Sequence, residues 1–171
     1  MLWNAIFWII FLFTAVNALM KSFTQEISSR EIYYYYLTGP LEVIIAKFIY
    51  NFLSLTVMGL LLSSSFVIFI NNPIVNYYWF LSALILGALG ISVVFTLSSS
   101  IASKGGNNAT LMSVLSIPLI LPIILMILKF SAVGLGILGG TGLMRDIYML
   151  LAIIIILIGV SLLLFPQIWR T

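Results

Sequence analysis

The sequence contains no cysteine and no histidine, and charged residues make up only 6% of its 171 positions. The missing cysteines exclude disulfides, thiol catalysis and thiolate metal sites, and the missing histidines exclude the commonest metal and haem ligand. A soluble domain of this length carries roughly a quarter charged residues, so this chain must present its surface to lipid. The net charge of +3 is too small and too scattered to indicate binding to nucleic acid.

Apolar residues are abundant instead: they make up 63% of the chain and gather in long runs. About 20 residues at roughly 1.5 Å each cross a hydrocarbon core of about 30 Å. The runs lack the alternation of barrel strands, and backbone groups in lipid must pair internally, so helices are predicted. The sequence therefore predicts an all-α integral membrane protein, a single transmembrane domain over 1–171 with five helices at about 2–20, 48–70, 78–102, 111–128 and 147–165.

The basic residues predict the orientation of these helices. Connections 21–47 and 103–110, together with the tail, carry five basic residues, whereas 71–77 and 129–146 carry two. The positive-inside rule places the richer set in the cytoplasm, so the C-terminus is predicted to be cytoplasmic. The chain then begins outside, directly in a span, and we expect a further helix encoded before Met1 that brings both ends inside.

The sequence offers no chemistry of its own. It has no Walker lysine, no paired carboxylates and no nucleophile beside a base, so we expect no enzyme activity. No predicted span carries a charge in its middle, although ion-coupled carriers usually keep one there. Methionine can ligate haem, but methionines in apolar spans usually serve packing, so no cofactor or metal site is assigned. Any active transport must therefore draw its energy from another chain.

The connection 21–47 is the most polar part of the chain and is called the coupling segment below. It holds six of the eleven charged residues with balanced signs: Lys21, Glu26, Arg30, Glu31, Glu42 and Lys47. We predict a short helix along the membrane surface, ended by Gly39 and Pro40. A lipid-binding helix would be strongly basic, whereas a neutral helix with four consecutive tyrosines is typical of a protein contact. A plain linker anchored by its tyrosines is the alternative.

Two prolines mark the fourth predicted span. Pro118 and Pro122 lie four residues apart and remove two backbone donors in adjacent turns, which predicts a kink. The kink is either a passive bend or a gating hinge, and the pattern fits both.

Glycine is also unevenly placed. Gly87 and Gly90, with nearby serines, form a stripe of small residues that favours close helix packing over the lining of a path. Five glycines in the stretch 134–142 resemble a phosphate loop only superficially, because no Lys-Ser/Thr pair follows. We expect an external flexible or re-entrant loop there.

The coupling segment resembles that of ABC-2-type permeases, in which it docks onto an ATPase subunit. The motif Leu-Thr-Gly-Pro-Leu-Glu with a following lysine carries this resemblance. Nearly the whole chain is more closely similar to the CcmB family, which has six helices and a cytoplasmic N-terminal segment absent here. The matching stretches are Asn17–Glu26, Arg30–Pro40, Ile44–Asn51, Ser100–Ile123 and Leu163–Thr171.

This resemblance implies the permease subunit of an ABC-type haem exporter for c-type cytochrome biogenesis in the bacterial inner membrane. Its implied partners are a CcmA-like ATPase, CcmC- and CcmD-like haem-handling subunits, and a second copy as a homodimer. Haem would be the substrate handled, either along a path through this subunit or by force transmission that releases a haem-loaded chaperone. An ABC-2 exporter of another lipid or small molecule is the alternative. The residues implied in ATPase coupling are Glu26, Arg30, Glu31, Tyr34, Gly39 and Pro40.

Overall fold

The described part of the chain is a bundle of long helices. The computed structural model describes residues 2–25, 40–70, 72–102, 108–139 and 142–170. These residues form five helices and no strand: α1 (Leu2–Gln25), α3 (Pro40–Ile70), α4 (Tyr77–Ala102), α5 (Asn108–Gly134) and α6 (Leu143–Arg170). Each contains a stretch long and apolar enough to cross a membrane, which confirms the predicted fold class.

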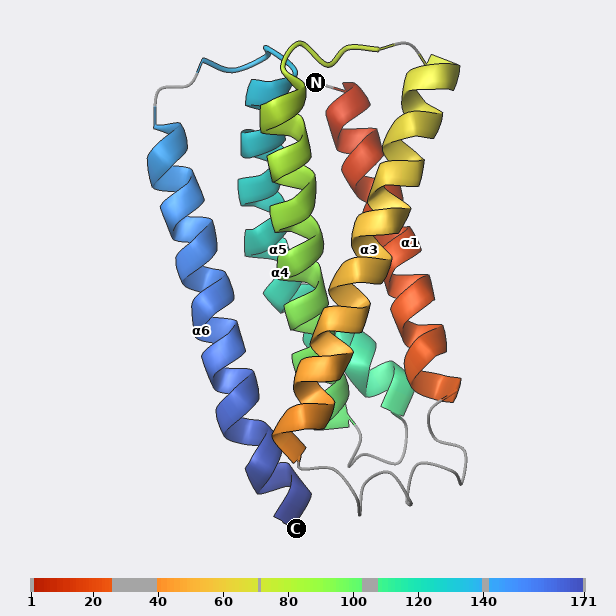
Figure 1. Cartoon of the computed structure of the whole chain (residues 1–171), viewed down its shortest axis with the longest axis vertical. Coiled ribbons are helices and arrows are strands. Elements are labelled where there is room, and N and C mark those ends of the chain that lie inside the picture. The colour runs from red at the N-terminus through yellow and green to blue at the C-terminus, as the bar shows by residue number, and fades with distance from the viewer. Residues whose placement is uncertain (1, 26–39, 71, 103–107, 140–141, 171) are drawn as a thin grey trace.

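The helices alternate in direction along the bundle (Figure 1). One end, called the upper end as drawn in Figure 1, holds the start of α1 and the two connections around 72–76 and 135–139. The opposite, lower end holds the start of α3 and the C-terminal end of α6. The two ends of the chain therefore lie at opposite ends of the bundle, as an odd number of crossings requires.

Helix α4 is the centre of the bundle. It contacts each of the other four helices, and 72% of its membrane span is buried, against 17–33% for the others. Its Gly87 leaves no room for a side chain, because a Cβ there would lie 2.7 Å from the Trp8 ring. A Cβ on Gly90 would lie 3.0 Å from Ile123. The small residues of α4 thus serve close packing, as the sequence predicts.

Several helices extend beyond the predicted spans. The predicted connection 129–146 is wrong at both ends, because α5 continues to Gly134 and α6 already begins at Leu143. Lys129 accordingly belongs to α5, and Arg145 to the first turn of α6. The sequence places Lys129 and Arg145 in an external connection because they are charged. A helix can nevertheless continue through such residues, because its backbone groups stay hydrogen-bonded while the long side chains reach the membrane interface.

The lower end shows the same extension. Helix α3 begins at Pro40 and includes Glu42 and Lys47, which the sequence assigns to the coupling segment. Proline is tolerated at the first helical position because its missing N–H has no partner there, and its fixed φ suits the helix. Pro40 therefore starts α3, and the last third of the coupling segment is part of a transmembrane helix.

Candidate functional site

Most of the predicted coupling residues lie outside the described residues. These are Glu26, Arg30, Glu31, Tyr34 and Gly39, so the predicted surface helix stays a prediction. The structure places Pro40 at the lower end, as the first residue of α3. Glu42 lies in the first turn of that helix, where a carboxylate interacts favourably with the helix dipole. The coupling segment is thus continuous with the end of α1 at Gln25 and with the start of α3 at Pro40.

A buried hydrogen bond links α3 to the central helix. The Asn51 side chain is 1% exposed, and its Nδ2 donates to Thr96 Oγ1 of α4 at 3.1 Å. Thr96 Oγ1 in turn donates to the carbonyl of Ser92 at 2.7 Å. An amide left unpaired at this depth would be costly, so the pair holds α3 and α4 in register. Motion of the lower half of α3 would therefore act directly on α4.

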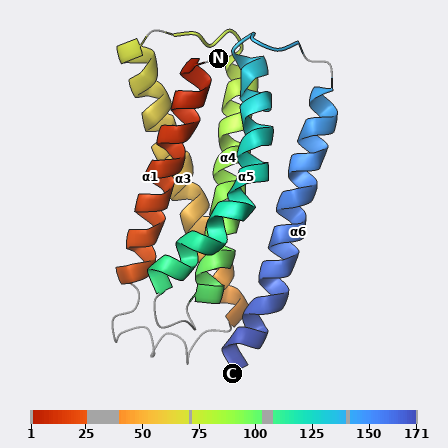
Figure 2. The ribbon, with the colours of Figure 1, turned by 180° about the vertical axis from the view of Figure 1, so that it is seen from behind.

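Helix α5 contains both predicted hinge prolines. Pro118 and Pro122 lie inside the helix, and both are exposed on its outer face. Without their N–H groups, the carbonyls of Val114 and Pro118 lose their usual helical partners. The ribbon of α5 changes direction along its length, its lower part turning towards α1 (Figures 1 and 2). The predicted kink is therefore present in α5.

The upper part of α5 is fixed to α1 by a polar cluster formed by Asn4, Trp8 and Ser131. Trp8 Nε1 donates to Ser131 Oγ at 2.8 Å, and Ser131 Oγ donates to Asn4 Oδ1 at 2.8 Å. Asn4 Nδ2 donates to the backbone carbonyl of Leu128 at 3.0 Å. All three side chains are buried, so breaking the cluster would leave unpaired polar groups in an apolar interior.

The end of α5 is also fixed to the start of α4. The Gly134 carbonyl accepts hydrogen bonds from the backbone N–H groups of Val75 at 3.1 Å and Asn76 at 2.8 Å. A Cβ on Gly134 would lie 2.7 Å from the backbone nitrogen of Phe80, so only glycine permits this approach. The segment of α5 above the prolines is therefore held by α1 and α4, and any hinge motion would displace the lower segment.

No charged side chain of the described residues is buried inside the bundle. Each charged residue with a described side chain (Glu42, Lys47, Lys129, Arg145 and Asp146) is exposed or half-buried. Among the described residues, no cluster of histidine, cysteine or acidic side chains could hold a metal ion.

One pocket opens between α3, α4 and α6. It has a volume of about 80 Å³ and is lined mainly by apolar side chains, including Ile45, Phe48 and Leu162. Sites for small organic molecules typically measure about 300–1,000 Å³, so this pocket is smaller than such a site.

Sequence reasoning assigned no role to Asn4, Trp8 or Asn51. The two asparagines could have indicated buried contacts, because an asparagine within an apolar span needs a hydrogen-bond partner. The partners of Asn4 and Asn51 lie on other helices, however, and spacing along the chain does not identify them.

Comparison with known proteins gives one match that covers almost the whole chain. The family model described as CcmB protein matches residues 2–168. No curated protein and no solved structure shows significant similarity to the chain.

Proposed function

Because the chain belongs to the CcmB family, we propose that it is the membrane subunit of an ABC-type haem exporter complex for c-type cytochrome biogenesis. The observation that carries this proposal is the family match over residues 2–168. The five membrane-crossing helices agree with a multi-pass permease subunit. ATP hydrolysis then belongs to a separate ATPase subunit, and the complex lies in the bacterial inner membrane.

We further propose that this subunit transmits force. The ATPase subunit docks on the coupling segment, and its movement passes along α3 to α4 through the Asn51–Thr96 hydrogen bond. The lower segment of α5 then swings about Pro118 and Pro122 while its upper segment stays fixed to α1. At the upper end this movement releases a haem-loaded chaperone from a neighbouring membrane subunit of the CcmC or CcmD type.

The composition of the bundle supports force transmission over a haem path. The chain has no histidine or cysteine to ligate haem iron. Eight consecutive residues of α4, 91–98, are buried in contacts with the other helices. We propose on this basis that haem is handled by the complex and is not held by this subunit as a cofactor.

Isolation of the complex tests the proposal. The tagged protein would be extracted from native membranes in a mild detergent, and its partners and bound pigment identified by mass spectrometry and absorbance. We expect an ATPase subunit and haem-handling membrane subunits to co-isolate. An unrelated multi-pass protein with the same tag is the control. Isolation with an ATPase but without any haem-handling partner would contradict the cytochrome role and favour an exporter of another molecule.

A further inference from the structure

Lys129 is a charged residue inside the membrane-crossing stretch Val114–Gly134 of α5. It lies five residues before Gly134, the last residue of α5, which corresponds to about 7.5 Å along the helix axis. Its side chain is exposed and forms no ion pair or hydrogen bond with the described residues. The outer face of α5 below it is apolar and exposed, with Leu121 and Leu125 in successive turns. An exposed ammonium group at this depth is therefore available to bind an anionic group from outside the chain.

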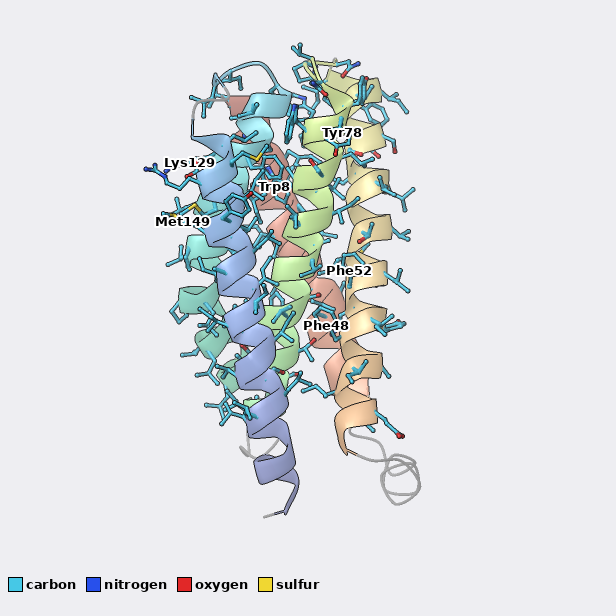
Figure 3. All side chains as sticks on the ribbon, turned by 60° about the vertical axis from the view of Figure 1, so that its left-hand side comes forward. Trp8, Phe48, Phe52, Tyr78, Lys129 and Met149 are labelled. Atoms are coloured by element: carbon cyan, nitrogen blue, oxygen red, sulfur yellow. The ribbon has the colours of Figure 1, made fainter. Side chains whose placement is uncertain are left out.

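A second cation lies at the same end of the bundle. Arg145 belongs to the first turn of α6, and its side chain is 76% exposed. Figure 3 shows Lys129 and Met149 projecting to the same side of the bundle. Arg145 precedes Met149 by four residues and so shares its face of α6. Its Nε lies 4.0 Å from Asp146 Oδ1, which leaves most of the guanidinium to bind another group.

Around the two cations, the net charge at the upper end of the bundle is positive, and the surface towards the lower end is apolar. At the upper end, the described residues carry Lys129, Arg145 and Asp146 and no other charged side chain. Towards the lower end, the same faces of α5 and α6 expose Leu125, Met149 and Ile156. A phosphate with acyl chains beneath it matches this distribution of charge and apolar surface.

We propose that Lys129 and Arg145 together bind the phosphate of an anionic phospholipid in the leaflet at the upper end, with its chains against α5 and α6. The guanidinium offers paired donors to the phosphate oxygens, and the ammonium adds a point charge. The long Lys129 side chain reaches the interface, where lipid phosphates already lie. This site does not depend on the proposed function.

Lipid titration followed by native mass spectrometry tests the site. The purified protein in a mild detergent would be titrated with phosphatidylglycerol and, separately, with zwitterionic phosphatidylcholine. We expect phosphatidylglycerol to bind the wild-type protein about tenfold more tightly. The double variant Lys129→Gln/Arg145→Gln should bind both lipids equally, and each single variant should lose part of the preference. Lys129→Arg should retain it, because the positive charge is kept.

Lys104→Gln is the matched control, since it removes one positive charge from a connection predicted to lie at the opposite face. It should keep the full preference for phosphatidylglycerol. An unchanged preference in the double variant, or no preference in the wild type, would overturn the site. Isolation of the wild-type protein and the double variant from native membranes separates a lipid ligand from a protein partner. If the double variant loses a membrane protein partner and keeps its lipid preference, the cations bind an acidic side chain of that partner, and the lipid assignment is wrong.

Discussion

The contact between Gly87 and Trp8 gives a sharp prediction for stability. In Gly87→Ala, the added Cβ would lie 2.7 Å from Cη2 and 2.8 Å from Cζ3 of Trp8. The indole cannot move aside without weakening its 2.8 Å hydrogen bond to Ser131. Overpacking typically costs about 1–3 kcal/mol and a lost hydrogen bond about 0.5–1.5 kcal/mol, while Gly→Ala within a helix gains about 1 kcal/mol. We expect a net loss of about 1–3 kcal/mol in the free energy of unfolding.

Gly159→Ala is the matched control in α6. No atom lies within 4 Å of a Cβ at Gly159, so this variant should gain up to about 1 kcal/mol from helix propensity alone. Both variants would be unfolded in mixed micelles by increasing denaturing detergent, and helix content followed by circular dichroism. A Gly87→Ala protein as stable as Gly159→Ala would refute the packing of α1 against α4 described above.

Three further predictions concern coupling. Reversing charges in Glu26→Lys/Arg30→Glu should uncouple ATP hydrolysis from cytochrome maturation without affecting membrane insertion, and unchanged association with the ATPase would refute docking there. Pro118→Ala/Pro122→Ala should restore two helical hydrogen bonds, stiffen α5 and lower holocytochrome c production while ATPase binding stays nearly normal. Full maturation would show that the kink is architectural. Asn51→Leu should retain the fold and ATPase binding but reduce holocytochrome c, because α3 loses its hydrogen bond to α4; normal output would exclude that link.

The spans could be predicted because length and apolarity suffice for them. Every predicted span overlaps a helix of the structure, and the packing role of Gly87 and Gly90 was also predictable, since small residues allow helices to approach. Helix ends were less predictable. Glu42, Lys47 and Lys129 appear polar enough to end a span, yet long side chains reach the interface while the backbone stays helical.

The tertiary polar contacts were not predictable from one sequence. Asn4 and Asn51 signal a need for partners, but Ser131 and Thr96 lie on different helices and are common residue types. The coupling residues Glu26, Arg30 and Glu31 lie outside the described residues and stay predictions. The prolines of α5 were recognised because proline alone removes a backbone donor, whereas the fixing of the upper part of α5 required the structure.

The state of the haem chaperone in cells that lack this protein tests the central claim most directly. The gene would be deleted, and both holocytochrome c and the haem-loaded chaperone quantified by haem staining and absorbance, with the wild-type gene restored as the control. Force transmission predicts that holocytochrome c is lost while the chaperone accumulates with haem bound, because haem is loaded but not released. A chaperone that stays empty of haem would contradict force transmission, and normal holocytochrome c would contradict the proposed function altogether.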